Sequence, residues 1–154
     1  MVAIKMKTTV KLRASGVASS HSRTEVSFRD ISIAIDEPTE RGGTNTGPSP
    51  TETAIAALIG CTNVIGNKCA DALGIDIGHL NINAICDFDR RGVTLTEEID
   101  EPFQRIELKV TCNGEASQPE IDKVAAEVAK YCPLSKLFRQ AGTEIVETWE
   151  KSNS

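Results

Sequence analysis

The sequence lacks the features by which proteins usually bind nucleic acids or membranes. Only 4% of the 154 residues are aromatic, and they do not cluster, so no platform for stacking single-stranded bases is predicted. The formal net charge is −5, whereas nucleic acids and anionic membrane surfaces are bound mainly by basic patches. No apolar run reaches the roughly 18 residues of a membrane span, and the amino-terminal residues alternate in polarity instead of forming a signal-peptide core. We therefore expect a cytoplasmic protein with no nucleic-acid and no membrane partner.

The cysteines do not form a pattern typical of a disulfide framework or of a metal site. Their number is odd, no C-x-x-C occurs, and the two histidines lie far from them in the sequence. In a cytosolic protein this argues against structural disulfides. No metal is predicted, although a zinc site assembled only in space stays open. We expect most of the thiols to be small core side chains; the five are Cys61, Cys69, Cys86, Cys112 and Cys132.

The pattern of apolar residues predicts an α+β protein that forms a single domain over residues 1–154. Alternating residues predict strands at 2–13, at 80–88, at 106–112 and at 143–150, and a meander of two or three strands within 17–36. A turn is expected at 14–16 and a polar loop at 36–48. Helices are expected within 47–73, at 118–132 and at 133–141. Because the strands look half-buried, we expect antiparallel sheets packed against helices.

The longest predicted helix, within 47–73, is the most apolar part of the chain. Ser49 and Glu52 form an S-x-x-E capping box around Pro50, which is tolerated at the first helical position. No polar side chain follows between Ala54 and Cys61, so we expect the helix to be buried on most of its circumference. One subunit has too few other elements to cover it, and this predicts a homodimer in which two such helices meet.

Cys61 and Cys132 are the two thiols with candidate functional positions. Cys61 lies among small residues of the apolar helix, where a cysteine is commonly an inert core side chain. Cys132 precedes Pro133 and is expected at the N-cap of a helix, where the dipole and free N–H groups favour a thiolate and lower the thiol pKa. Cys132 also follows Val128 at helical spacing, so a buried apolar position is the alternative.

Two separated motifs resemble those of the OsmC/Ohr superfamily, the osmotically inducible and organic hydroperoxide resistance proteins. They are GGTNTGPSPTETAIAALIGCTN at residues 42–63 and YCPLSKLF at residues 131–138. The resemblance implies an intertwined homodimer with two long central helices between sheets. It implies that Cys61 is the peroxidatic thiol and Cys132 the resolving thiol, joined by an intramolecular disulfide during turnover. It further implies organic hydroperoxides as substrates, an external dithiol or lipoyl reductant, and no cofactor.

The sequence departs from the peroxidase branch of that superfamily around the helix start. The branch has glutamate directly after the proline, where this chain has Thr51, and Glu52 comes one residue later. In a helix, Glu52 and Cys61 are nine residues, about 180° and roughly 13 Å apart. Glu52 therefore cannot reach Cys61 of its own helix and could reach only the thiol of a partner chain, if the two helices cross suitably. Helix capping is the alternative to catalysis for this carboxylate.

No motif places the arginine that the resemblance implies beside the thiolate. Arg41, in the loop before the apolar helix, is the first candidate, followed by Arg23 and Arg13. A solvated surface charge is the alternative for each of them.

Two functions follow from these observations. The first is a cysteine-based peroxidase for organic hydroperoxides that uses Cys61 and Cys132, and the presence of both thiols favours it. The second is a redox-responsive thiol or small-ligand-binding stress protein with little turnover. The missing Pro-Glu pair and the unplaced arginine favour the second.

Overall fold

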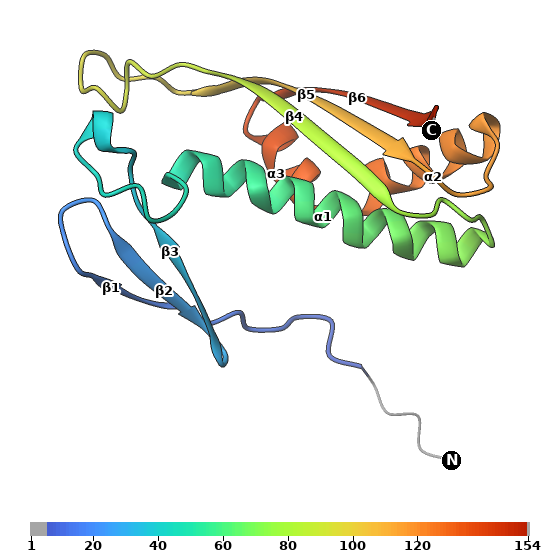
Figure 1. Cartoon of the computed structure of the whole chain (residues 1–154), viewed down its shortest axis with the longest axis horizontal. Coiled ribbons are helices and arrows are strands. Elements are labelled where there is room, and N and C mark those ends of the chain that lie inside the picture. Colours follow the sequence, from blue (N-terminus) through green and yellow to red (C-terminus); the bar gives the residue numbers. More distant parts are fainter. Residues whose placement is uncertain (1–5, 154) are drawn as a thin grey trace. The chain divides into compact units, whose positions relative to one another are not determined.

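The computed structural model describes residues 6–153 of the chain (Figure 1). This part divides into two compact units, which meet in the sequence between Thr53 and Ala54 and which we describe separately. The α+β class is confirmed, because strands and helices follow one another along the chain without a repeating βαβ pattern. The expectation of one domain stays a prediction.

The amino-terminal unit contains a three-stranded antiparallel meander in the order β1-β2-β3. Its strands are β1 (Ser15–Ala18), β2 (Thr24–Phe28) and β3 (Ile31–Ile35). β1 pairs with β2 from Ser15↔Ser27 to Ala18↔Thr24, and β2 pairs with β3 from Thr24↔Ile35 to Phe28↔Ile31. The predicted antiparallel meander is therefore confirmed.

The strand predicted at 2–13 is wrong in the part that the structure describes. Val2 and Ile4 lie outside the described residues, but Met6 to Ala14 adopt no strand. Met6, Val10 and Leu12 are 84%, 70% and 92% exposed. A strand needs a hydrogen-bonded neighbour, and within residues 6–153 the edge strand β1 pairs with β2 alone. The turn predicted at 14–16 is also wrong, because β1 begins at Ser15.

The loop after β3 is organised around the buried carboxylate of Asp36. This carboxylate accepts hydrogen bonds from the backbone N–H of Glu37 at 2.8 Å and from the N–H and hydroxyl groups of Thr44 and Thr46. The hydroxyl of Thr44 contributes most to lowering the pKa of Asp36 well below its usual range. Glycine is required at 43 in this loop, because a Cβ there would lie 1.9 Å from the carbonyl oxygen of Glu37. The loop thus has a polar anchor in place of a hydrophobic one, and it includes the short 3-10 helix η1 (Thr39–Arg41).

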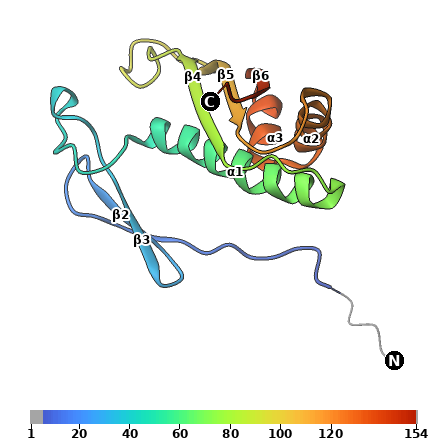
Figure 2. The ribbon, with the colours of Figure 1, turned by 45° about the vertical axis from the view of Figure 1, so that its right-hand side comes forward.

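The carboxy-terminal unit packs helices against one face of a three-stranded sheet in the order β4-β5-β6 (Figures 1 and 2). The strands are β4 (Leu80–Phe88), β5 (Phe103–Cys112) and β6 (Glu144–Lys151). Along β5, Ile106, Leu108 and Val110 are buried, and the residues between them are exposed. A strand with one covered face requires this alternation. The three strands confirm those predicted from alternating residues at 80–88, at 106–112 and at 143–150.

One pairing in this sheet differs from the expected antiparallel arrangement. β4 and β5 are antiparallel from Leu80↔Cys112 to Phe88↔Phe103, but β5 and β6 run parallel from Arg105↔Glu144 to Cys112↔Lys151. Parallel neighbours need a long crossover, and helices α2 (Gln118–Tyr131) and α3 (Pro133–Gln140) provide it. Alternation along a strand reports its covered face and not the direction of its partner, so the pattern alone could not predict this pairing.

The predicted helix starts are confirmed at the level of single hydrogen bonds. α1 spans Pro50–Leu73, and Ser49 and Glu52 form the reciprocal capping box: the Glu52 carboxylate accepts from the Ser49 N–H, and the Ser49 hydroxyl accepts from the Glu52 N–H. Ser117 and Glu120 form the same box at α2. No helix within residues 6–153 is both long and apolar enough to cross a membrane.

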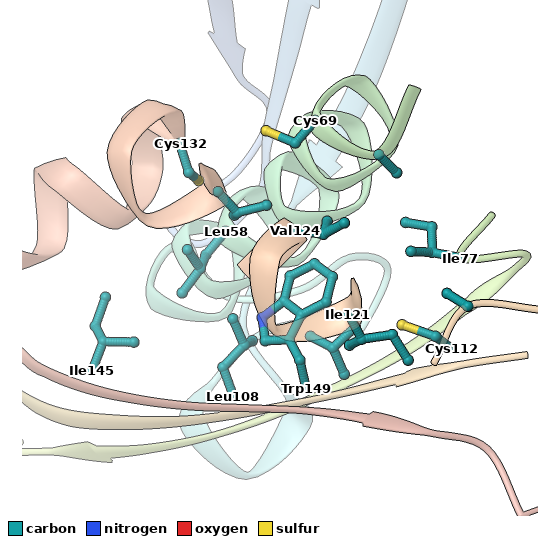
Figure 3. Packing of buried hydrophobic residues seen from close by; sticks show 14 of the residues in the cluster. Leu58, Cys69, Ile77, Leu108, Cys112, Ile121, Val124, Cys132, Ile145 and Trp149 are labelled. Atoms are coloured by element: carbon teal, nitrogen blue, oxygen red, sulfur yellow. The ribbon is translucent and has the colours of Figure 1, made fainter. Parts of the chain in front are cut away.

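The hydrophobic core of the carboxy-terminal unit lies between the helices and the sheet (Figure 3). α1 contributes Leu58, Cys69 and Ala70, and α2 contributes Ile121, Val124 and Val128 at helical spacing. Leu108, Ile145 and Trp149 extend from the strands toward them. Cys69 and Cys112 are buried here, and Cys86 is partly buried against the cluster, so all three are packed as the sequence predicts.

The chain by itself buries one face of α1, and the expectation that a partner chain covers the rest of its circumference stays a prediction. Its buried residues are Leu58, Thr62, Gly66, Cys69 and Ala70, which lie on one face. Ala56, Ala57 and Gly60 are exposed, and Val64 is 51% exposed. The sheet and the other helices of the carboxy-terminal unit cover only this side of α1. A second, apolar face of the helix is therefore left open within that unit.

The two glycines of α1 give a matched test of this one-sided packing. A Cβ at position 66 would lie 3.0 Å from the indole of Trp149, whereas a Cβ at position 60 meets nothing within 4 Å. Overpacking costs about 1–3 kcal/mol, and replacing a helical glycine by alanine gains about 1 kcal/mol. For the single subunit, we expect Gly66→Ala to lower the free energy of unfolding in urea denaturation and Gly60→Ala to raise it. Equal effects of the two substitutions would contradict the described packing.

Candidate functional site: two thiols on α1 and α3

Cys61 lies on α1, three residues after the fully buried Leu58. Its side chain is partly buried and packs against the hydrophobic core. The thiol is free. This position combines a fixed helical backbone with partial access from solvent, which a reacting thiol needs.

Cys132 lies where α2 ends and α3 begins. Its N–H donates to the carbonyl of Val128 at 2.9 Å, which closes the last turn of α2. Its sulfur accepts a hydrogen bond from the Ser135 N–H at 3.5 Å, and Pro133 occupies the first position of α3. The predicted N-cap position is therefore confirmed, and so is the alternative of a buried residue following Val128, because Cys132 is 0% exposed.

The expectation that the helix N-cap gives Cys132 a low thiol pKa is wrong. Burial is the largest influence and raises the pKa of Cys132 to about 11, since desolvation disfavours the charged thiolate. The backbone N–H groups of Ser135 and Leu134 act in the opposite direction and lower this pKa. The helix terminus thus lowers the pKa of Cys132 as expected, but burial raises this pKa by more.

The structure brings Cys61 and Cys132 together. A side-chain hydrogen bond with Cys61 and the charge of Cys61 both raise the pKa of Cys132. Both residues belong to the carboxy-terminal unit. The arrangement provides two adjacent, reduced thiols, one partly accessible and one fully buried.

Glu52 and Arg41 belong to the amino-terminal unit. Glu52 is engaged in the capping box with Ser49, at 2.9 Å from the Ser49 nitrogen. Arg41 donates from Nε to Glu37 at 2.7 Å, and this hydrogen bond raises the pKa of the guanidinium. Glu52 also acts on Arg41 through its charge. Helix capping and a surface ion pair account for the contacts that the two side chains make, and a catalytic role for either stays a prediction.

The two other candidate arginines also lie in the amino-terminal unit. Arg23 forms an ion pair with Glu25, while its Nε is buried without a hydrogen-bond partner among residues 6–153. Arg13 is exposed in the segment before β1.

The other three cysteines have no second thiol among the groups that influence them. As for Cys132, burial raises the thiol pKa of Cys69, Cys86 and Cys112, but no cysteine acts on any of these three. Among residues 6–153, no group of three or more His, Cys, Asp and Glu side chains is placed to hold a metal ion.

Sequence reasoning missed three residues that a series of polar contacts connects to Cys132. Ser135 is buried and donates to its sulfur, and Arg139 donates from Nε to the Ser135 hydroxyl at 3.1 Å. Glu147 on β6 lies 3.5 Å from Arg139. The S-x-x-x-R spacing within a helix was the one signal in the sequence, because residues four apart face each other. The contact with β6 has no local signal.

Comparison with known proteins identifies the family of this chain. A family model described as OsmC-like protein matches residues 43–148, which include both thiols, the apolar helix and most of β6. The chain belongs to the OsmC-like protein family. The resemblance found in the sequence motifs is thereby confirmed. No curated protein matches the chain.

Solved OsmC-like structures share the fold at low sequence identity. An OsmC-like protein from Mycoplasma pneumoniae superposes with a TM-score of 0.78 at 21% identity, covering 94% of this chain and 99% of that one. An organic hydroperoxide resistance protein OsmC from Legionella pneumophila gives 0.67 at 17% identity, covering 95% and 99%. An organic hydroperoxide resistance protein from Elizabethkingia anophelis, with bound thiocyanate, gives 0.68 at 18% identity, covering 97% and 100%. These TM-scores and coverages show that the chain has the fold of the OsmC-like structures.

Proposed function

We propose that this OsmC-like protein is a cysteine-based peroxidase that reduces organic hydroperoxides. The observation that carries the proposal is the contact between the partly accessible Cys61 thiol and the buried Cys132 thiol within one unit. The fold shared with organic hydroperoxide resistance proteins supports the choice of substrate class. The apolar residues that surround the pair favour alkyl hydroperoxides over hydrogen peroxide.

In the proposed reaction, the thiolate of Cys61 attacks the terminal oxygen of the hydroperoxide. The S–O bond forms, the O–O bond breaks, and the alkoxide leaves as an alcohol after taking a proton. Cys61 becomes a sulfenic acid. The sulfur of Cys132 then attacks the Cys61 sulfur, the S–S bond forms, and the hydroxide of the sulfenic acid leaves as water with the thiol proton.

An external dithiol then reduces the disulfide by thiol–disulfide exchange and is itself oxidised. A lipoyl group is a reductant of this chemical class. We place the reaction in the cytoplasm, because Cys61 and Cys132 must return to free thiols and this compartment keeps thiols reduced. No metal or cofactor takes part in these steps.

A homodimer is part of the same proposal. α1 leaves a face of small and apolar residues open along Ala57, Gly60 and Val64. Small residues permit close approach of two helices, and an exposed apolar face of this kind is typical of an interface. Sedimentation velocity should give the mass of two chains, whereas a monomer at micromolar concentration would contradict this part of the proposal.

A second function, a slow redox-responsive thiol pair, is favoured by one observation. Cys132 is fully buried with its pKa raised to about 11, and a protonated thiol is a poor nucleophile for closing a disulfide. Such a pair of thiols would become oxidised when an oxidant is present but would consume little hydroperoxide catalytically.

Steady-state consumption of hydroperoxide distinguishes the two functions. We expect the purified protein to consume many equivalents of cumene or tert-butyl hydroperoxide with dihydrolipoamide as the dithiol. Consumption that stops after one equivalent per pair of thiols, with excess dithiol present, would overturn the peroxidase proposal and favour the slow thiol pair.

A further inference from the structure

Cys132 stands at one end of a chain of polar contacts that crosses from α3 to the sheet. The Ser135 N–H donates to the Cys132 sulfur at 3.5 Å. The Ser135 hydroxyl accepts from Nε of Arg139 at 3.1 Å, and the Arg139 guanidinium lies 3.5 Å from the carboxylate of Glu147. α3 has only eight residues, so these contacts span it from its first turn to its last.

The far end of this chain is a carboxylate on the covered side of β6. Glu147 lies between Ile145 and Trp149 in the strand register, and its side chain is only 13% exposed. Burial raises the pKa of Glu147, and the charge of Arg139 lowers it. A carboxylate costs free energy in such a place unless it is paired, and Arg139 is its charged partner.

We propose that Arg139 is a positioning residue for the Cys132 thiol, acting through Ser135 and tied to the sheet by Glu147. The guanidinium fixes the hydroxyl of Ser135, and with it the first turn of α3, whose Ser135 N–H holds the Cys132 sulfur in place toward Cys61. Arg139 touches neither sulfur. This inference rests on the proposed function for the role of Cys132 as the resolving thiol.

Positioning matters at this site because a disulfide forms only within a narrow geometry, with Cα atoms about 4.4–6.8 Å apart. Cys132 is buried at the start of α3, so it does not lie on an exposed loop that could move its sulfur into that geometry. Because α3 is held at both ends, it orients the sulfur before the reaction begins.

The first experiment measures the Cys132 thiol without any peroxide chemistry. In a Cys61→Ser background, the alkylation of Cys132 by iodoacetamide is followed against pH by peptide mass spectrometry. Arg139→Met and Ser135→Ala each remove the contact between the guanidinium and the Ser135 hydroxyl, which releases the first turn of α3. Both should move the profile to higher pH, because the backbone N–H of Ser135, which lowers the pKa of Cys132, is then no longer held against the sulfur. Arg139→Lys keeps the positive charge and should shift the profile less far than Arg139→Met does. A profile that stays in place, or that moves to lower pH because the sulfur has merely become exposed, would overturn the proposal.

The second experiment measures closure of the disulfide. Diamide, which accepts the two thiol hydrogens, is added to the protein with both cysteines, and formation of the Cys61–Cys132 bond is timed. Arg139→Met should slow closure by about tenfold or more, as expected for a misplaced reacting group. Arg105→Met is the matched control, because Arg105 also forms an ion pair with β6, through Glu144 at 3.6 Å, but belongs to β5. Slowing of both variants to the same extent would contradict a specific role for Arg139.

These measurements separate the two proposals. If the protein consumes no hydroperoxide but Arg139→Met still moves the alkylation profile and slows closure by diamide, the peroxidase function fails and the positioning role stands. If turnover is observed and neither measurement changes, the positioning role fails alone.

Discussion

Replacing Cys61 by serine should abolish hydroperoxide consumption, with a loss of about a thousandfold or more. Serine keeps the size of the side chain but provides no thiolate, and the attack on the O–O bond then has no nucleophile. Cys132 cannot take over, because burial raises its thiol pKa to about 11. The measurement is the initial rate with cumene hydroperoxide and a dithiol.

Two further cysteine variants make this result specific. Cys132→Ser should still reduce about one equivalent of hydroperoxide and then accumulate the Cys61 sulfenic acid, which dimedone traps. Cys69→Ala should retain most of the activity, because Cys69 is buried eight residues further along α1. A fully active Cys61→Ser protein, or an inactive Cys69→Ala protein that is folded, would assign the chemistry to another thiol.

Leu58→Ala should have the largest effect on stability among single changes in α1. Leu58 is 0% exposed in the core that also contains Cys132. Truncating a buried leucine removes its transfer free energy and leaves a cavity, which together cost about 2–5 kcal/mol. The free energy of unfolding from urea denaturation, followed by the fluorescence of the single tryptophan Trp149, measures this loss.

Leu73→Ala is the matched control for this substitution. It makes the same chemical change in the same helix, but Leu73 is 45% exposed at the end of α1. We expect a cost of about 1 kcal/mol or less, because roughly half of the side chain is already in contact with water. Similar losses for both variants would contradict the assignment of Leu58 to the core and of Leu73 to the surface.

Local patterns predicted most of the elements of this fold. The capping boxes at Ser49 and Ser117 and the alternation of β4 and β5 are fixed by neighbours in the sequence. The direction of β6 could not be predicted in this way, because it depends on the crossover through α2 and α3. The segment before β1 shows that alternation alone does not make a strand. Its residues alternate in polarity, but within residues 6–153 no strand pairs with it.

The sequence was sufficient to choose the two cysteines of the candidate site, but it was not sufficient to predict the thiol pKa of Cys132 or the nearby ion pair. Cys61 and Cys132 could be chosen from two motifs, and the N-cap position of Cys132 from Pro133. The pKa of Cys132 could not be predicted, since it is dominated by complete burial, which depends on the packing of elements distant in sequence. The contact between Arg139 and Glu147 was hidden for the same reason, because α3 and β6 meet only in the folded chain.

The central claim is that Cys61 and Cys132 react with each other after hydroperoxide is reduced. The most direct measurement is peptide mapping of the protein after one equivalent of cumene hydroperoxide, with free thiols blocked by alkylation before digestion. We expect a disulfide-linked pair of peptides that contain Cys61 and Cys132, with Cys69, Cys86 and Cys112 alkylated. Hydroperoxide consumed without this link, or a link that joins Cys61 to a different cysteine, would contradict this claim.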